Sequence, residues 1–419
     1  MYDTIIIGGG VSGIMAAVAA SENKQKVLLI EKNKQLGKKL LISGGGRCNV
    51  TNNLPYEEII QNIPGNGKFL YGPFSIFDNQ SIIQFIESHG VKLKEEDHGR
   101  MFPVSNKAKD VLQVFLNCLD NQHVEILLNT EVKEILHDNA SITGVKLTDG
   151  KTIKSHNIII TTGGKSVPHT GSTGDGFKFA KNLGHSVTNL FPTEVPILSN
   201  EPFIKSGDLK GLSLKNVKLS VLKKNGKPRI SHQMDMLFAH FGITGPAALR
   251  CSQFVIKELE KQKTETVMME LDYFPEFSSH DLRQKIEIDV KANKDKAVHN
   301  VLKQFIENRY VDFMFNHLKL DKTMTGHNFD NESKNKILNF LKSFQFKVTG
   351  TQPIEKSFVT GGGVHLKEID PKTMESKIIK GLHFAGEVLD IHGYTGGYNI
   401  TSALVTGYVA GQHAGQNTN

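Results

Sequence analysis

Residues 4–13 read Thr-Ile-Ile-Ile-Gly-Gly-Gly-Val-Ser-Gly, and this stretch decides the fold. The apolar run 4–7 is typical of a central parallel strand, and the small residues of 14–21 predict a helix directly after the glycines. A second apolar run, Val27–Ile30, ends at Glu31. Strand, Gly-rich turn, helix and strand in about 30 residues form a βαβ unit.

The glycines of the turn have the spacing Gly8-x-Gly10-x-x-Gly13. Gly8 permits a tight turn, Gly10 lets the backbone approach a pyrophosphate, and Gly13 allows close packing of helix on strand. The helix N-terminus supplies N–H groups to the phosphates. A carboxylate at Glu31 accepts hydrogen bonds from ribose hydroxyls and repels a 2′-phosphate. The unit therefore predicts a dinucleotide site.

Three later features favour FAD as the dinucleotide. The buried strand and turn at 158–164 resemble the second strand–turn of glutathione reductase-class flavoproteins, and 172–176 open another helix. Residues 381–387 resemble the late Gly-Asp turn that holds the phosphate–ribityl region of FAD, with Glu387 in place of Asp. Residues 396–399 then begin a last helix, whose N–H groups face the flavin pyrimidine edge in this interpretation.

The most distinctive stretch is 41–52, Leu-Ile-Ser-Gly-Gly-Gly-Arg-Cys-Asn-Val-Thr-Asn. Three glycines beside Arg47 suit close backbone contact with an anionic or planar ligand. Cys48 has no second cysteine within ten residues, so a dithiol–disulfide relay is not expected. We interpret Cys48 as a small packing residue near the flavin rather than as a nucleophile.

Five segments together resemble the BaiN/RdsA family of FAD-dependent oxidoreductases, which includes aminoacetone oxidase-like and rRNA dihydrouridine synthase-like flavoproteins. They are 43–52, 99–103 (Gly-Arg-Met-Phe-Pro), 237–246, 360–364 and 386–399. The resemblance implies an α/β fold: a Rossmann-type FAD-binding domain of the glutathione reductase class, an inserted β-barrel-like domain and a small helical subdomain. It also implies that the insertion is not a nicotinamide-binding domain.

The residue pattern predicts the same three parts. The FAD-binding domain takes 1–190 plus 346–419, because both segments carry strand–Gly turn–helix patterns. Short alternating strands predict a β-rich domain over 191–278, with a possible return strand near 341–355. The charged, helix-periodic stretch 279–345 predicts the helical subdomain.

Composition places the protein in the cytoplasm. No stretch of about 18 apolar residues predicts a membrane span, and no membrane partner is expected. Cys48, Cys118 and Cys251 lie too far apart for a disulfide framework or a metal site.

The net charge is +7, and eight Lys and Arg residues fall in 201–230 against Glu201 and Asp208. Such a segment is either a solvated basic face or a surface for a polyanion such as RNA, and composition leaves both open.

These motifs and the resemblance together give the candidate cofactor-binding residues. They are Gly8, Gly10, Ser12, Gly13, Glu31, Lys32, Ser43, Gly44, Gly45, Arg47, Cys48, Asn49, Val132, Thr162, Gly163, Gly174, Asp175, Gly386, Glu387, Gly397, Tyr398, Asn399 and Ile400. No metal site is expected.

The leading hypothesis for the reaction is hydride transfer from reduced FAD to the C5=C6 bond of a uridine in large-subunit ribosomal RNA. The basic segment motivates it, and the target base must leave its stack to reach the flavin. NAD(P)H is the expected transient electron donor. The candidates for positioning the base or donating the proton are Arg100, Cys48, His240, Tyr394 and Asp390.

Two alternatives stay open. One is a small-molecule flavin enzyme, either an ene-reductase or an amine oxidase of the aminoacetone type. The other is a non-catalytic flavoprotein that binds ribosomal RNA or its precursor without consuming a reductant. The fold alone does not choose among these.

Overall fold

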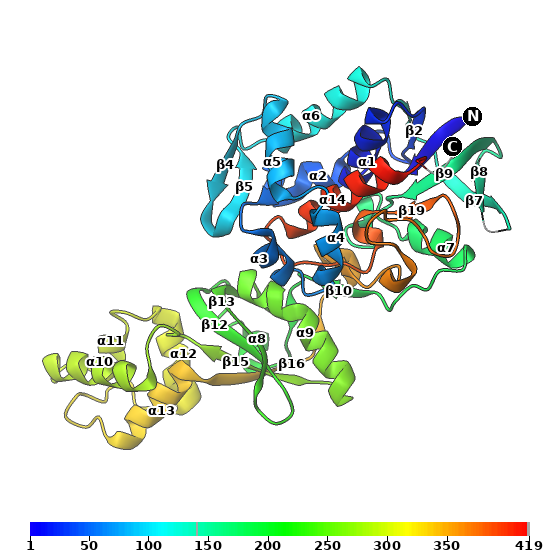
Figure 1. Ribbon diagram of the computed structural model, residues 1–419. Helices are drawn as coiled ribbons and strands as arrows, with labels where there is room; N and C mark the ends of the chain where they lie inside the picture. Colours follow the sequence, from blue (N-terminus) through cyan, green and yellow to red (C-terminus); the bar gives the residue numbers. More distant parts are fainter. Residues whose placement is uncertain (140, 417–419) are drawn as a thin grey trace. The chain divides into compact units, whose positions relative to one another are not determined.

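The computed structural model describes residues 1–139 and 141–416, and the chain divides into two units. The first unit comprises Met1–Phe191 and Ile354–Asn419, and the second comprises Pro192–Pro353. The predicted boundaries at 190 and 346 lie close to these divisions. Segments on both sides of the insertion thus build one body, which Figure 1 shows as blue and red elements side by side.

A seven-stranded sheet forms the centre of the first unit. Its strands are β1 (Tyr2–Ile7), β2 (Val27–Ile30), β6 (Glu125–Leu127), β7 (Val132–Asp138), β8 (Ser141–Leu147), β9 (Thr152–Ile160) and β19 (Leu382–Phe384). The order is β6-β2-β1-β9-β8-β7, and β19 also pairs with β9. The pairs β6-β2, β2-β1, β1-β9 and β9-β19 are parallel, whereas β7, β8 and β9 form an antiparallel meander.

Two helices of small residues pack together beside this sheet. They are α1 (Val11–Glu22) and α14 (Tyr398–His413). A Cβ at Gly407 would lie 2.4 Å from the carbonyl oxygen of Ser12, and one at Gly411 would lie 2.2 Å from that of Ala16. The backbones therefore approach so closely that only glycine fits at these two positions of α14.

The region between β2 and β6 contains both helices and strands. The structure has α5 (Asn79–Ser88) and α6 (Ala108–Asn121), whereas Leu93–Glu96 is strand β4 and Arg100–Pro103 is strand β5. Together with β3 (Thr51–Asn52) these strands form a small antiparallel sheet. Short helices complete the region: α2 (Lys38–Ile42), α3 (Tyr56–Gln61) and α4 (Tyr71–Phe74), with α7 (Asp175–Asn182) after β9.

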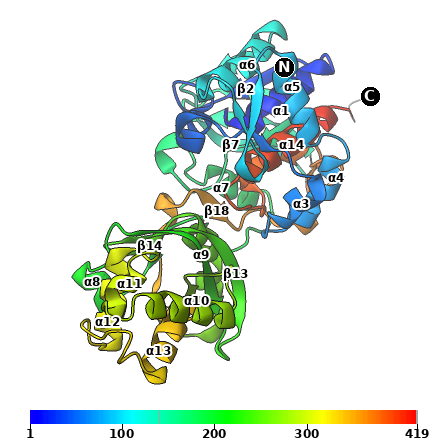
Figure 2. The same ribbon diagram turned by 90° about the vertical axis from the view of Figure 1, so that its left-hand side faces the viewer.

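The second unit contains another seven-stranded sheet, in the order β16-β15-β12-β13-β14-β11-β17 (Figure 2). Its strands are β11 (Ile197–Leu198), β12 (Ser213–Leu222), β13 (Pro228–Ala239), β14 (Gly242–Thr244), β15 (Val267–Asp272), β16 (Phe344–Val348) and β17 (Gly350–Thr351). The last two lie within 341–355, the segment for which a return strand was predicted.

A long helix in this unit was not predicted. Residues Pro246–Gln262 form α9, which packs against the sheet, where only short strands were expected. Proline suits the first turn of a helix because its missing N–H has no intrahelical acceptor there. Ala247, Cys251 and Val255 are buried at four-residue spacing and give α9 its apolar face.

The predicted helical stretch 279–345 contains four helices. They are α10 (Ser279–Ala292), α11 (Val298–Leu302), α12 (Asn308–Leu318) and α13 (Asn331–Lys342). Tyr310, Phe313 and Phe340 of these helices belong to the same hydrophobic core as Phe203 and Phe344. The β-rich and helical parts therefore share one core.

Candidate cofactor site

The Gly-rich turn between β1 and α1 carries three glycines in three different environments. At Gly8 the backbone has φ +109°, and a Cβ would lie 2.7 Å from the carbonyl oxygen of Thr161. At Gly13 a Cβ would lie 1.9 Å from the carbonyl oxygen of Gly8. At Gly10, which caps α1, no heavy atom of the other described residues lies within 4 Å of the Cβ position, apart from those of its chain neighbours. Gly8 and Gly13 thus hold the turn closed, while Gly10 faces open space before the helix N-terminus.

Glu31 ends β2 beside this turn, and its side chain is fixed. The carboxylate accepts hydrogen bonds from the backbone N–H of Gly9 at 2.6 Å and of Asn33 at 2.8 Å. The residue is 8% exposed. Val132, the first residue of β7, lies nearby. Two residues before it, the Thr130 N–H donates a hydrogen bond to the carbonyl oxygen of Glu31 at 3.0 Å. The structure therefore gathers these two candidates at the carboxyl end of β2, the edge of a parallel sheet where nucleotides bind.

Two further candidates form an ion pair. The ammonium of Lys32 lies 2.6 Å from a carboxylate oxygen of Asp175, the first residue of α7. Burial would raise the pKa of Asp175, but the hydrogen bonds from Lys32 and Thr173 and the charges of Lys32 and Lys178 together lower the pKa. Gly174 precedes this helix in a left-handed conformation. The segments 31–33 and 172–175 thus lie side by side.

The loop from Ser43 to Asn49 contains a buried acceptor without a donor. Asn49 is 8% exposed, and its Oδ1 has no hydrogen-bond partner among the described residues. A Cβ at Gly397 would lie 3.1 Å from this oxygen, so it points toward the start of α14. At Gly45 the Cβ position is open: apart from its chain neighbours, no described residue lies within 4 Å. A buried acceptor costs free energy unless it is satisfied, so this loop fits a ligand that offers an N–H.

Two neighbours in the loop are occupied by protein contacts. The Arg47 guanidinium pairs with Glu96 and lies over the Phe102 ring, 4.2 Å from its centroid. Cys48 is fully buried, and burial raises the pKa of its thiol to about 12. Cys48 is therefore a protonated thiol enclosed by protein at neutral pH, as a packing residue would be.

The late turn and the start of α14 lie against the first helix. A Cβ at Gly386 would lie 2.5 Å from the Ser12 hydroxyl oxygen of α1. Asn399 closes the loop that leads into α14: its Oδ1 accepts from the Gly393 N–H at 2.8 Å, and its Nδ2 donates to the Tyr394 carbonyl oxygen at 3.1 Å. The side chain of Asn399 thus holds the backbone of Gly393 and Tyr394 in the loop before the helix.

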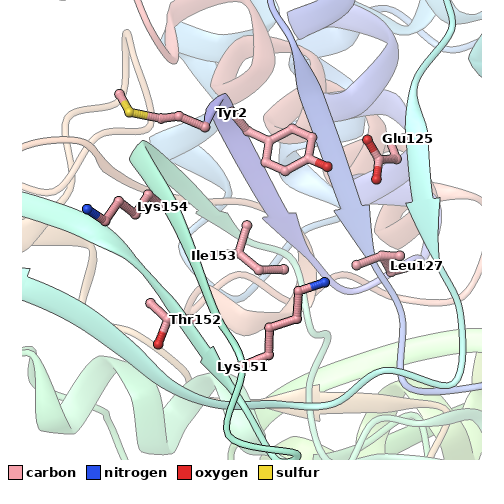
Figure 3. Close-up of a pocket in the computed structure, with 8 residues that line it drawn as sticks. Tyr2, Glu125, Leu127, Lys151, Thr152, Ile153 and Lys154 are labelled. Atoms are coloured by element: carbon pink, nitrogen blue, oxygen red, sulfur yellow. The ribbon is translucent and has the colours of Figure 1, made fainter.

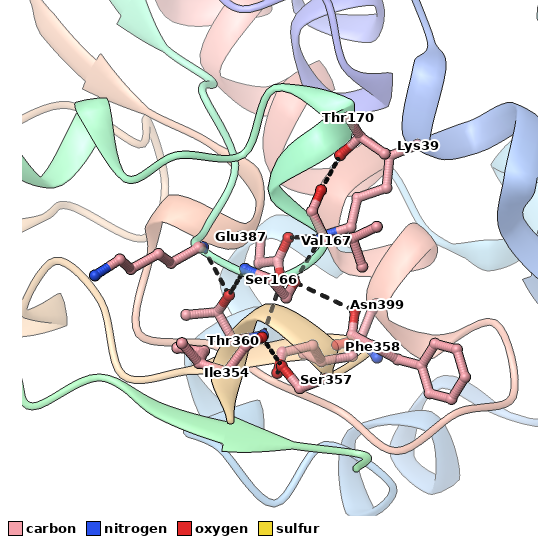
Figure 4. Close-up of polar contacts among 12 residues, drawn as sticks. Lys39, Ser166, Val167, Thr170, Ile354, Ser357, Phe358, Thr360, Glu387 and Asn399 are labelled. Atoms are coloured by element: carbon pink, nitrogen blue, oxygen red, sulfur yellow. Dashed lines mark hydrogen bonds and ion pairs between the residues drawn. The ribbon is translucent and has the colours of Figure 1, made fainter. Parts of the chain in front are cut away.

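Glu387 occupies the centre of a polar cluster (Figure 4). Its carboxylate accepts from the Lys39 ammonium at 2.8 Å, the Ser166 hydroxyl at 3.0 Å and the Thr360 N–H at 2.8 Å. Sequence reasoning missed Lys39, since its partner lies 348 positions away along the chain. A lysine on a short helix gave no local signal of this contact.

The remaining cofactor candidates fall in the same elements. Ser43 and Gly44 open the 43–49 loop, Thr162 and Gly163 follow β9, and Tyr398 and Ile400 lie in the first turn of α14. The Thr162 hydroxyl is buried without a hydrogen-bond partner among the described residues.

The catalytic candidates divide between the two units. Arg100 begins β5, whose partner β3 hydrogen-bonds through Asn52 to the Gly396 carbonyl oxygen at 3.1 Å. Asp390 and Tyr394 lie in the loop before α14, and Arg100 pairs with Asn52, whose side chain contacts this loop at Gly396. His240 is exposed in the turn between β13 and β14 of the second unit.

A hollow of about 390 Å³ opens at the opposite edge of the first sheet (Figure 3). Tyr2, Glu125 and Thr152, the first residues of β1, β6 and β9, line it. Burial and the neighbouring Glu125 carboxylate raise the pKa of Tyr2 to about 12. Nucleotides bind at the carboxyl ends of parallel strands, so this amino-end hollow is not the cofactor site.

The chain matches a known protein family over nearly its whole length. The profile described as "HI0933-like protein Rossmann domain" matches residues 2–413. Ribosomal RNA dihydrouridine synthase of Haemophilus influenzae is 28% identical over 410 residues, covering 97% of this chain and 96% of that protein. The 3-dehydro-bile acid delta(4,6)-reductase of Clostridium scindens is also 28% identical, covering 98% of both chains. The family resemblance is confirmed.

Solved structures agree on the fold. The 3-ketosteroid delta1-dehydrogenase from Sterolibacterium denitrificans matches with a TM-score of 0.54 and 14% identity over 99% of both chains. A flavocytochrome c3 fumarate reductase matches with a TM-score of 0.50 and 17% identity, covering 99% of this chain and 78% of that one. The predicted Rossmann-type FAD-binding fold is confirmed. No helix in the described part of the chain is long and apolar enough to cross a membrane.

Proposed function

This chain belongs to the HI0933-like family of Rossmann-domain proteins, and from that premise we propose that it reduces uridine to dihydrouridine in large-subunit ribosomal RNA. It is an FAD-dependent oxidoreductase. The relatives named ribosomal RNA dihydrouridine synthase, from H. influenzae and Escherichia coli, match 97% and 98% of this chain. The lysines of the β12–β13 turn, described below, favour RNA over a small molecule as the substrate. The proposed setting is the cytoplasm, with NAD(P)H as the electron donor.

The proposed cofactor contacts build on the geometry of the site. The N-terminus of α1, open in front of Gly10, receives the pyrophosphate, and Glu31 accepts from the adenosine ribose. The Oδ1 of Asn49, which has no partner in the described part of the chain, and the N-terminus of α14 receive the polar edge of the flavin ring. Reduced FAD bound there supplies the hydride for the C5=C6 bond of uracil.

The chain supplies the proton that completes the reduction. Hydride adds to C6, and a proton must reach C5, next to the C4 carbonyl. Of the candidates in and beside the loop before α14, a phenol offers an O–H that can donate a proton, whereas a guanidinium is a poor general acid. We therefore favour Tyr394 as the donor and Arg100 as a positioning cation. The enclosed thiol of Cys48 is less suited.

The basic segment 201–230 supports an RNA substrate, but fewer than its eight Lys and Arg side chains are left without a carboxylate partner among the described residues. Lys215 and Lys218 pair with Asp235 and Asp272. In contrast, Lys223, Lys224 and Lys227 surround the tight turn between β12 and β13 and have no carboxylate partner among the described residues. These three ammonium groups are the proposed phosphate contacts.

Charge reversal at the turn tests the RNA contact directly. We expect Lys223→Glu/Lys224→Glu/Lys227→Glu to bind ribosomal RNA fragments more weakly and to reduce the slope of log Kd against log salt by about 2. The control, Lys215→Glu/Asp235→Lys, exchanges the charges of an existing pair and should bind like the parent protein. Equal affinity and slope in the triple variant would remove the turn as an RNA surface.

The decisive experiment is dihydrouridine mapping of ribosomal RNA from cells with and without this gene. We expect one dihydrouridine to disappear in the deletion strain and to return with the intact gene but not with Tyr394→Phe. The Tyr394→Phe protein should retain its bound flavin, which is checked by its absorption spectrum. An unchanged map in the deletion strain would refute the ribosomal RNA substrate.

A second candidate is a small-molecule ene-reductase, since the C. scindens bile-acid reductase is as similar as the RNA-modifying relatives. Both names describe reduction of a carbon–carbon double bond conjugated to a carbonyl group. Oxidation of the reduced flavin by conjugated enones, followed by absorbance, tests this candidate. Turnover with an enone, an unchanged ribosomal RNA map and no effect of the lysine reversals would favour it.

A further inference from the structure

The cluster around Glu387 joins four segments that are distant along the chain (Figure 4). Lys39 lies on α2, Ser166 follows β9, Thr360 lies in β18 (Val359–Gly361), and Glu387 lies in the turn after β19. The Lys39 ammonium donates to Glu387 at 2.8 Å and to the Ser166 hydroxyl oxygen at 2.8 Å. Figure 4 shows the side chains of Lys39 and Ser166 meeting at the carboxylate. The contacts hold both charged groups in one position.

The carboxylate is ionised in this setting. Burial raises the pKa of Glu387, but the charge and hydrogen bond of Lys39, the Thr360 N–H and the Ser166 hydroxyl outweigh it and lower the pKa. The side chains of Lys39 and Glu387 are 31% and 19% exposed. The pair is thus partly open to a ligand. An ammonium carries three N–H donors, and among the described residues its acceptors are the two oxygens just named.

The pair lies beside the turn that is open in front of Gly10. Gly386, the neighbour of Glu387, packs on Ser12 in the first turn of α1. A Cβ at Gly163, in the turn after β9, would lie 3.9 Å from a carboxylate oxygen of Glu387. An ionised carboxylate in this position repels phosphate groups held at the N-terminus of α1 unless a cation stands between them.

We propose that Lys39 is a cofactor-binding residue that Glu387 and Ser166 hold in place so that its third N–H donates to the pyrophosphate of FAD. Lys39 also neutralises Glu387, which allows a carboxylate and a pyrophosphate to occupy neighbouring positions. The inference rests on FAD as the cofactor and does not depend on which substrate is reduced.

The test compares FAD binding by the full-length protein and its Lys39→Met variant after removal of flavin, using flavin fluorescence. Loss of one charge-assisted hydrogen bond to phosphate should raise the Kd roughly 10-fold to 100-fold. Lys34→Met removes an exposed lysine of the same segment and should leave the Kd within about twofold. If Lys39→Met fails to fold, Lys39→Gln, which keeps a donor toward Glu387, replaces it in the same comparison.

Phosphorus NMR of the reconstituted proteins identifies the group that Lys39 contacts. We expect the pyrophosphate resonances of bound FAD to move in Lys39→Met while the flavin absorption bands stay unchanged. A Kd equal to that of the parent protein, or unmoved phosphorus resonances, would overturn the proposal. A parent protein that does not bind FAD at all would instead refute the cofactor, which separates the two failures.

Discussion

Replacement of Gly10 separates cofactor binding from folding. Within the described part of the chain, the Cβ position of Gly10 has no contact within 4 Å beyond its chain neighbours. Its backbone, at φ −76° and ψ 179°, suits any residue. Gly10→Val lowers stability by removing a favourable helix N-cap residue and raises it by making the unfolded chain less flexible. Each effect is below about 1 kcal/mol, and they oppose each other. We therefore expect the free energy of unfolding of the flavin-free protein to change by less than about 1 kcal/mol.

The effect of Gly10→Val on FAD is much larger. The new side chain fills the space before the first N–H groups of α1, where we place the pyrophosphate. Loss of two charge-assisted hydrogen bonds, at about 1.5–3 kcal/mol each, weakens binding by more than about 100-fold. Urea unfolding without flavin and fluorescence titration with FAD measure the two quantities, and Gly10→Ala should give a smaller loss of affinity. Full FAD affinity in Gly10→Val, or a matching loss of stability, would refute the reasoning.

Three further outcomes are expected from the same geometry. Gly13→Ala should destabilise the protein by at least about 2 kcal/mol in urea unfolding, because its Cβ would lie 1.9 Å from the carbonyl oxygen of Gly8. The pKa of Glu387 is lowered in the folded protein, so its ionised form stabilises the fold above the ordinary value of 4.5, and this stabilisation is lost as the pH falls through the folded-state pKa. The Tm of the parent protein should therefore exceed that of Glu387→Gln by less at pH 3 than at pH 6. A constant difference in Tm would contradict this expectation. Cys48, fully buried with its pKa raised to about 12, should react with iodoacetamide only at the rate of unfolding, and rapid labelling of the native protein would contradict its enclosure.

The first βαβ unit could be predicted because its signals are local. Val27–Ile30 forms β2 with the expected bounds, and the helix begins within the expected glycine turn at Val11. A buried parallel strand appears in the sequence as a short continuous apolar run, and the glycine spacing predicts the tight turn and the helix after it.

Helix α9 was missed because its apolar residues support two interpretations. Residues 191–278 contain short apolar runs between basic turns, and this pattern is also typical of a β-rich domain. The useful signals were Pro246 after Gly245, and Ala247, Cys251 and Val255 at a spacing of four. Packing of α9 against the strands of the second sheet decides between helix and strand, and this contact is not local.

The same limit applies to charges in the candidate sites. The segment 201–230 shows eight basic residues, but the sequence does not show that Lys215 lies 2.6 Å from Asp235 on the neighbouring strand. The contact of Lys39 with Glu387 likewise depends on strands that meet only in the folded sheet. Sequence patterns predict which backbone turns bind phosphate. Which charged side chains can contact a ligand depends on ion pairs between residues that are distant in the sequence, and these pairs form only in the folded protein.

The discontinuous first unit has a consequence for synthesis of the protein. Strand β19 and helix α14 complete the sheet and cover α1, yet the ribosome makes them only after all of Pro192–Pro353. At about 5–20 residues per second, β1 and α1 wait tens of seconds for these partners. During that time the apolar strands of the unfinished sheet remain accessible to chaperones. The nascent chain therefore acquires a complete flavin site only after α14 has been made.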